Sequence, residues 1–315
     1  MQEAQMSDIK LFRTLPESVE ELSPRSAKLE SELQKQIEAN MNTFLSIRFL
    51  ATEFSISNGG RIDSLGLDEN GCPVIIEYKW HSNENVINQG LFYLDWLLDH
   101  KADFKLLAMS VLGKDVADTI EWSGARLVCI ASDFNRYDEY AIKQIDRNIE
   151  LMRYKYFSDD LLLLELVNTQ ISSKPAAHEP VAITSIQTES KKLSANDWTL
   201  KKAKTQCGEQ LLSLFDELCS FTESLSDDIV RKDLKLYTAF KRIKNLACVS
   251  IVPNKEPRVV IWLKLDPASI ELESGFTKDV RNVGHWGTGD LEIEIRNEEQ
   301  ANKAKVLIQK AFEES

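Results

Sequence analysis

Residues 60–80 of the chain, GRIDSLGLDENGCPVIIEYKW, decide how the fold is interpreted. Two runs rich in β-branched residues flank a turn signal, Asn70-Gly71, and this is the pattern of a β-hairpin. Asp63 lies near the start of the first run, and Glu77 and Lys79 lie at the end of the second. Two acids and a lysine on one hairpin are typical of a metal-dependent site.

The register of the hairpin decides whether these three side chains share a face. A two-residue turn would place Asp63 on the face opposite to Glu77 and Lys79. A three-residue loop, 69–71, with its final glycine in the left-handed conformation, places Asp63 directly across from Glu77. Because side chains alternate along a strand, Lys79 then shares that face. We therefore predict the three-residue loop.

The hairpin resembles the catalytic core of the PD-(D/E)XK nuclease superfamily. Asp63 followed by Glu77-Tyr78-Lys79 is similar to the motif that names the superfamily, with Ile62 in place of its proline. The resemblance implies a metal-dependent deoxyribonuclease, a DNA endonuclease that hydrolyses phosphodiester bonds. It also implies a restriction-endonuclease-like fold.

Two flanking motifs extend the resemblance. Gln89-x-x-x-Tyr93 resembles an element of the RecB-like branch, and its i, i+4 spacing puts both side chains on one helix face. Glu30-x-x-Leu33 resembles the first-helix motif of the branched-DNA and mismatch endonucleases typified by NucS. From the residue pattern alone, Glu32 and Glu38 compete with Glu30.

The resemblance implies a role for each of these residues. Asp63, Glu77, Glu30 and the backbone carbonyl of Tyr78 would hold Mg²⁺ or Mn²⁺, hard cations that prefer oxygen ligands. Lys79 would hold or deprotonate the attacking water. A further pair would orient that lysine or the scissile strand: Gln89 and Tyr93.

Phosphate contacts are expected from four basic side chains: Arg61, Lys241, Arg242 and Lys244. The last three belong to a basic stretch, 231–244, with interleaved aromatic residues, which fits a nucleic-acid face and equally fits an amphipathic helix with a solvated side. DNA is the expected partner, although RNA would suit the same chemistry. Superfamily members often work as dimers, so a homodimer is also an expectation.

Composition limits the choice of function. The 315 residues carry a net charge of -12, which opposes nucleic-acid binding unless a basic face is local. The five cysteines have no CxxC spacing, and no long apolar segment or secretory leader is apparent, so we expect a cytoplasmic protein without a membrane span. The alternative function is a catalytically silent nuclease-like module that binds nucleic acid or protein.

The predicted fold is α/β, with a mixed central sheet flanked by helices, followed by a small α+β domain. The first domain would span residues 1–170, a linker 171–196 and the second domain 197–315, since the linker lacks apolar periodicity. Residues 1–22 would form an extended arm or an added strand. Elements expected after that arm are a helix at 24–43, a strand at 46–57, the hairpin, a helix at 86–100, a strand at 104–109, a helix at 111–122, a strand at 125–130, a helix or turn at 142–151 and a strand at 154–167.

The second domain shows a simpler pattern. Helices are expected at 210–225 and 298–312, and strands at 247–252, 259–265 and 291–295. Two stretches, 236–242 and 284–290, resemble an uncharacterised C-terminal domain family that follows nuclease-like domains. This resemblance implies no activity.

Overall fold

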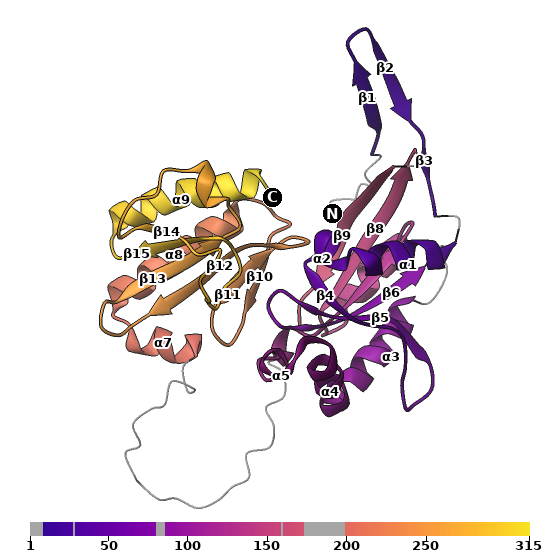
Figure 1. The fold of residues 1–315 in the computed structure, drawn as a ribbon, viewed down its shortest axis with the longest axis horizontal. Coiled ribbons are helices and arrows are strands. Elements are labelled where there is room, and N and C mark those ends of the chain that lie inside the picture. Colours follow the sequence, from indigo (N-terminus) through magenta and orange to yellow (C-terminus); the bar gives the residue numbers. More distant parts are fainter. Residues whose placement is uncertain (1–8, 28, 80–85, 159, 173–198) are drawn as a thin grey trace, which may run out of the picture. The chain divides into compact units, whose positions relative to one another are not determined.

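The structure is a computed structural model that describes residues 9–27, 29–79, 86–158, 160–172 and 199–315. The chain divides into two compact units, Met1–Ala177 and His178–Ser315 (Figure 1). From residue 173 onward the predicted linker lies outside the described residues, as does Trp80. Within the described residues, no helix combines the length and the apolar content that crossing a membrane requires.

A seven-stranded mixed sheet forms the centre of the first unit, in the order β3-β8-β7-β6-β5-β4 with β9 paired to β8. β6, β7 and β8 are parallel, and the other neighbours are antiparallel. The central strand β7 is buried along its whole length. The strands are β3 (Pro24–Arg25), β4 (Ile47–Ser55), β5 (Arg61–Asp68), β6 (Pro73–Lys79), β7 (Arg126–Ala131), β8 (Ile149–Phe157) and β9 (Leu161–Gln170).

Helices cover both faces of this sheet. α1 contacts β5 and β6, whereas α3 contacts β6 and β7. Ser64 of β5 bonds to α1, and its neighbour Leu65 packs into the core that α3 covers, because successive side chains alternate. The helices are α1 (Glu30–Ala39), α2 (Met41–Leu45), α3 (Val86–Asp99), α4 (Lys101–Leu112), α5 (Lys114–Ala117), the short 3₁₀ helix η1 (Trp122–Gly124) and α6 (Arg136–Lys143). The predicted mixed sheet between helices is confirmed.

Several predicted elements of this unit are wrong. Residues 104–109 are helical within α4, because Phe104 and Ala108, four residues apart, are its two buried positions. The predicted helix at 111–122 is reduced to α5 and η1. The predicted helix or turn at 142–151 covers the end of α6, the connection after it and the start of β8.

The first and last predicted elements of this unit also differ from expectation. The predicted strand at 154–167 is two antiparallel strands, β8 and β9, that pair with each other. The first helix begins at Glu30 rather than at residue 24, because Pro24 and Arg25 pair with β8 as strand β3. The expected arm is a separate two-stranded hairpin, β1 (Leu11–Leu15) with β2 (Ser18–Leu22), which projects from the unit in Figure 1.

The second unit is an antiparallel six-stranded sheet in the order β10-β11-β12-β13-β15-β14. α8 and α9 pack on one of its faces, where alternate strand residues such as Val249, Ile261 and Ile293 form the core. The elements are α7 (Leu200–Gln206), α8 (Glu209–Ser224), β10 (Val230–Asp233), β11 (Thr238–Lys241), β12 (Asn245–Val252), β13 (Arg258–Leu263), the 3₁₀ helix η3 (Pro267–Ser269), β14 (Thr277–Asp279), β15 (Leu291–Ile295) and α9 (Glu298–Glu313). The predicted helices and strands are confirmed. The amphipathic-helix interpretation of residues 231–244 is wrong, because they hold β10 and β11.

Candidate active site

The β5–β6 hairpin has the predicted three-residue loop. The Asp68 N–H donates to the Cys72 carbonyl at 2.9 Å, and the Gly71 N–H donates to the Asp68 carbonyl at 3.0 Å. Gly71 has φ +76°, the left-handed conformation that this loop requires. Ser64 lies opposite Ile76, and Asp63 and Glu77 are the next residues beyond this last ladder pair.

At the open end of the hairpin, backbone N–H groups donate to side-chain carboxylates instead of to the backbone carbonyls of the opposite strand. Ladder pairing between β5 and β6 ends at Ser64 and Ile76. Beyond that point the Asp63 N–H donates to Glu77 Oε1 at 3.2 Å, and the Tyr78 N–H donates to Asp63 Oδ2 at 2.9 Å. The two acids therefore bind each other's strand and lie side by side.

Burial keeps both acids in an unfavourable environment for negative charge. Glu77 is fully buried, and this burial, together with the charge of Asp63, raises the pKa of Glu77 to about 9. Burial also raises the pKa of Asp63 to about 6, although the bond from the Tyr78 N–H opposes the shift. Among the described residues, no donor lies within hydrogen-bonding distance of Glu77 Oε2. A buried acid oxygen without a donor is a group that a cation would stabilise.

Lys79 and Glu30 meet at the same end of the hairpin. Lys79 Nζ lies 3.7 Å from Glu30 Oε1, although the two residues come from different elements, β6 and α1. Lys79 lowers the pKa values of Asp63 and Glu77, and Glu30 raises both. These four predicted site residues thus form one electrostatic group.

Two further α1 residues contact the hairpin: Gln34, which was not predicted as a site residue, and Glu38, which competed with Glu30 in the residue pattern. Gln34 Nε2 donates to the Asp63 carbonyl at 3.0 Å and to Glu38 Oε1 at 3.1 Å. Ser64 Oγ donates to the same Glu38 oxygen at 2.6 Å. With Glu30, they form a stripe at i, i+4 and i+8 along one side of α1. That spacing is the signal that could have identified them.

Gln89 and Tyr93 lie together on α3, as their spacing predicted. Gln89 Nε2 donates to Tyr93 Oη at 3.2 Å, and that oxygen also accepts from the Arg61 N–H at 3.3 Å. A side chain at Gly60 would collide with the Tyr93 ring. The pair therefore supports the start of β5, two residues before Asp63. That Gln89 and Tyr93 orient Lys79 or the scissile strand stays a prediction.

The predicted phosphate contacts differ in exposure. Arg61 is exposed, and its Nε lies 3.3 Å from Glu53 Oε2. In the second unit, Lys241 is buried and Arg242 forms an ion pair with Asp228 at 2.7 Å, whereas Lys244 is exposed. Lys244 and Arg61 are therefore the more accessible cations of the four.

The residues present offer a partial metal site. Asp63 and Glu77 supply neighbouring hard oxygens, and Glu77 Oε2 has no donor among the described residues. No group of three or more carboxylate, imidazole or thiol side chains arranged to hold a metal ion occurs within the described ranges. Among the described residues, the side chains that could hold a cation are thus Asp63 and Glu77, with Glu30 directed to Lys79. Such a pair fits Mg²⁺ or Mn²⁺ when other oxygen ligands complete the shell, since Mg²⁺ is commonly bound through one or two carboxylates.

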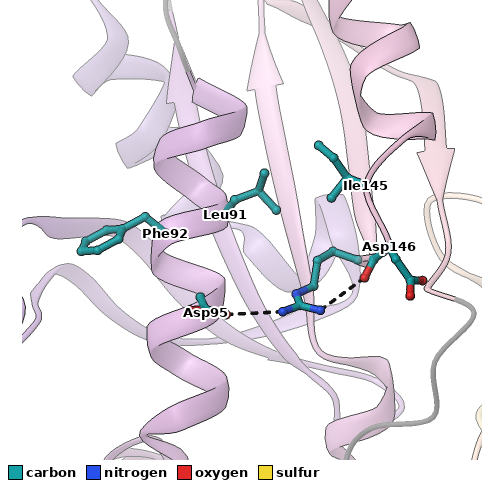
Figure 2. Close-up of a pocket in the computed structure, with 6 residues that line it drawn as sticks. Leu91, Phe92, Asp95, Ile145 and Asp146 are labelled. Carbon is teal, nitrogen blue, oxygen red and sulfur yellow. Dashed lines mark hydrogen bonds and ion pairs between the residues drawn. The ribbon is translucent and has the colours of Figure 1, made fainter.

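A shallow pocket of about 430 Å³ contains none of the predicted site residues (Figure 2). Its lining comes from α3 and from the segment after α6: Leu91, Phe92, Asp95, Ile145, Asp146 and Arg147. Arg147 donates to Asp95 Oδ1 at 3.4 Å and to the Asp146 carbonyl at 3.3 Å. The carboxylate of Asp95 is therefore the charged partner of this guanidinium.

Comparison with known proteins adds most to the second unit. Residues 199–315 match a family described as a domain of unknown function, DUF5655. The predicted uncharacterised C-terminal domain family is confirmed by this match. An uncharacterised protein of Haemophilus influenzae is 29% identical over 311 residues, which cover 97% of this chain and 100% of that protein.

A solved structure of an EndoMS–dsDNA complex shows a low similarity. The alignment has 17% identity and a TM-score of 0.25, and it covers 41% of this chain and 47% of the EndoMS chain. The chain therefore spans about half the length of that structure's protein.

Proposed function

We propose that the first unit is a metal-dependent nuclease that hydrolyses phosphodiester bonds, with DNA as its substrate. The observation that carries the proposal is the joint position of Asp63, Glu77 and Lys79 at the open end of one hairpin. Two acids bonded to each other's strand, beside a lysine, form a compact site for binding a cation and handling a proton. The order of these residues along the chain supports the same proposal through its resemblance to the PD-(D/E)XK superfamily.

Asp63, Glu77 and the Tyr78 carbonyl would hold Mg²⁺ or Mn²⁺. When bound, the cation would neutralise developing phosphate charge and lower the pKa of water. Lys79 would bind the attacking water or the phosphate oxygen, and Glu30 would hold the ammonium group in place. Gln34, through its bond to the Asp63 carbonyl, would keep β5 in position against α1.

The alternative is a silent module that binds nucleic acid or protein through the same fold. The net charge of -12 favours it, because an acidic protein repels a polyanionic substrate. A silent module would bind its partner without turnover.

Cleavage assays separate the two functions. Supercoiled and branched DNA would be incubated with Mg²⁺ or Mn²⁺ and the full chain, beside Asp63→Ala, Lys79→Ala and Asp95→Ala. We expect the wild type and Asp95→Ala to cut, because Asp95 is a surface acid, 68% exposed, and we expect the other two to lose roughly 10²–10⁴-fold in rate. Equal cleavage by all four proteins would indicate a contaminating nuclease.

Binding measurements complete the test. Calorimetric titration should detect Mn²⁺ binding by the wild type and its loss in Glu77→Ala. DNA binding and Mn²⁺ binding without cleavage would support the silent module. Absence of Mn²⁺ binding by the wild type would overturn the metal-dependent proposal.

A further inference from the structure

The exposed side of helix α6 carries cations and tyrosines but no acid. Ile142 anchors the opposite side of the helix and is fully buried. The two acids of the helix, Asp138 and Glu139, are half-buried, and Asp138 completes the N-terminal capping box with Asn135. The exposed positions of the helix are Arg136, Tyr137, Tyr140, Ala141 and Lys143. We call the four large side chains among them the α6 face: Arg136, Tyr137, Tyr140 and Lys143.

Each cation of the α6 face lies against a tyrosine ring. The guanidinium carbon of Arg136 lies 4.9 Å from the centroid of the Tyr137 ring, and Lys143 Nζ lies 5.5 Å from the centroid of the Tyr140 ring. Arg136 Nη2 also donates to Tyr137 Oη at 3.0 Å. Both rings remain accessible, because Tyr137 is 68% exposed and Tyr140 is 65% exposed. Two pairs of one ring and one cation therefore follow each other along the helix.

The charge of the α6 face is opposite in sign to that of the whole chain. Across the described residues, neither Arg136 nor Lys143 forms an ion pair with a carboxylate. By contrast, Arg61, Lys105 and Arg147 each lie within 3.4 Å of one. Because the net charge is -12, this protein can bind a polyanion only at a surface where cations gather without acids. The α6 face meets that condition.

The N-terminal end of α6 lies at the same edge of the sheet as the candidate active site. β6 and β7 are parallel, and Lys79 at the end of β6 pairs with Ala131 at the end of β7. α6 begins at Arg136, five residues after Ala131, and five residues span at most roughly 17 Å. Neighbouring strands are about 4.8 Å apart, and stacked nucleotides are about 3.4 Å apart. A DNA strand that passes Lys79 can therefore reach the α6 face within about seven nucleotides.

We propose that the α6 face binds a single strand of DNA that extends from the cleavage site. Each tyrosine ring would stack on an unpaired base, and the two cations would contact the neighbouring phosphates. A duplex fits less well, because the faces of its bases are already covered by neighbouring bases. The choice of DNA as the ligand rests on the proposed function, and the inference adds that the substrate has a single-stranded segment beside the cleaved bond.

Fluorescence anisotropy of a labelled single-stranded oligonucleotide of about 16 nucleotides tests the proposal in EDTA, where metal-dependent cleavage cannot occur. The full-length wild type should bind this strand more tightly than a duplex of the same length. Tyr137→Ala combined with Tyr140→Ala should raise the Kd at least about tenfold, because both stacking rings are lost. Tyr137→Phe combined with Tyr140→Phe should bind like the wild type, because the rings remain. Phe12→Ala removes a ring that is 50% exposed on β1, and this matched control should also bind like the wild type.

The salt dependence of binding tests the two cations separately. For single strands, the logarithm of the association constant falls with the logarithm of the salt concentration, with a slope of about -0.7 for each phosphate contact. Arg136→Gln combined with Lys143→Gln should therefore make the slope less negative by about 1.4. Lys105→Gln replaces an exposed lysine on α4, and this control should leave the slope unchanged.

Binding and cleavage can fail independently. If the wild type cuts DNA but the double alanine variant binds the single strand as tightly as the wild type, this inference is wrong and the nuclease function stands; the α6 face would then be left for a protein partner. Single-strand binding that needs both tyrosines, without cleavage, would support the α6 face and contradict the catalytic function. A wild type that binds no single strand or prefers the duplex would overturn the inference.

Thermal unfolding by circular dichroism would check that the variants are folded. If the double alanine variant is not, the salt slope of Arg136→Gln combined with Lys143→Gln decides. An unchanged slope would overturn the proposal, and a slope that is less negative by about 1.4 would support it.

Discussion

The two ends of the β5–β6 hairpin both bury acids, but the acids at the two ends differ in their hydrogen-bond and charge partners. At the turn, Asp68 accepts from the N–H groups of Asn70 at 2.9 Å and Cys72 at 2.8 Å, and it also pairs with Arg126. The Arg126 Nε in turn lies 3.1 Å from Glu150 Oε1. Burial alone would lower the pKa of Arg126, but Glu150 and Asp68 raise it above its usual value. Both acids at this end therefore have a cationic partner, Arg126, although Arg126 Nε forms no hydrogen bond within the described residues.

At the open end, the described residues leave one acid oxygen without a hydrogen-bond donor. Glu77 has one oxygen bonded to the Asp63 N–H and the other without a donor among the described residues. Its pKa and that of Asp63 are raised, chiefly by burial. The difference teaches that burial of an acid is not by itself a functional signal. A buried acid that lacks a donor among the described residues is the better candidate.

Exchanging one acid at each end for its amide should separate activity from stability. Asp63→Asn should reduce DNA cleavage by up to roughly 10⁴-fold, equivalent to about 5 kcal/mol, because it removes a carboxylate of the proposed metal site. Asp68→Asn should leave the cleavage rate of the folded protein close to wild type while lowering its midpoint of urea unfolding. The two measurements are made on the same preparations.

The stability of the Asp63→Asn variant is the matched control. Asp63→Asn should unfold at a urea concentration equal to or above that of the wild type at pH 8, since it removes an acid whose pKa is raised to about 6. If Asp63→Asn loses stability and Asp68→Asn loses activity, the division between the two ends is wrong.

Removing the buried cation tests the completeness of the turn end. Arg126→Met would leave Asp68 and Glu150 buried without their shared partner, so we expect a loss of about 3–5 kcal/mol in the free energy of unfolding. Urea denaturation measures this loss. Adding Asp68→Asn and Glu150→Gln should recover part of it, because neutral amides no longer require the guanidinium. A loss below about 1 kcal/mol, the range of exposed ion pairs, would show that the triad is not structural.

The sequence was most informative where local chemistry determines geometry. The turn residues of the hairpin and strand alternation together predicted which way Asp63, Glu77 and Lys79 point, because a glycine at the left-handed position fixes the loop length. By contrast, residues 104–109 are a short apolar run that fits a strand or a helix equally, and only packing decides between them. The helix α4 is the result of that packing.

The features that the sequence did not predict depend on contacts between segments that lie far apart in the chain. Asp63 and Asp68 lie on the same strand, and residue type and spacing do not distinguish them. Of the two, Asp68 is the acid that pairs with Arg126. Lys241 belongs to a basic stretch that suggested a nucleic-acid face, but its position in β11 buries it. Compensation and burial are tertiary properties, so residue type and spacing alone could not separate these cases.

The smallest of the three effects is a pH dependence at the open end. The folded-state pKa of Glu77, about 9, lies above its ordinary value of 4.5, so the folded protein keeps a proton that the unfolded chain releases. The stabilisation from that proton is complete below pH 4.5 and is lost as the pH rises through about 9, at up to about 1.4 kcal/mol per pH unit.

Glu77→Gln does not titrate, so between pH 5 and pH 7 its free energy of unfolding should gain roughly 3 kcal/mol relative to the wild type. Urea unfolding at a series of pH values measures the difference, with Asp95→Asn, which replaces an exposed acid outside the site, as the control variant. Mg²⁺ should reduce the difference at pH 8, because a cation replaces the proton as the partner of Glu77; a difference that stays constant from pH 5 to pH 9 would mean that Glu77 is already compensated, as Asp68 is.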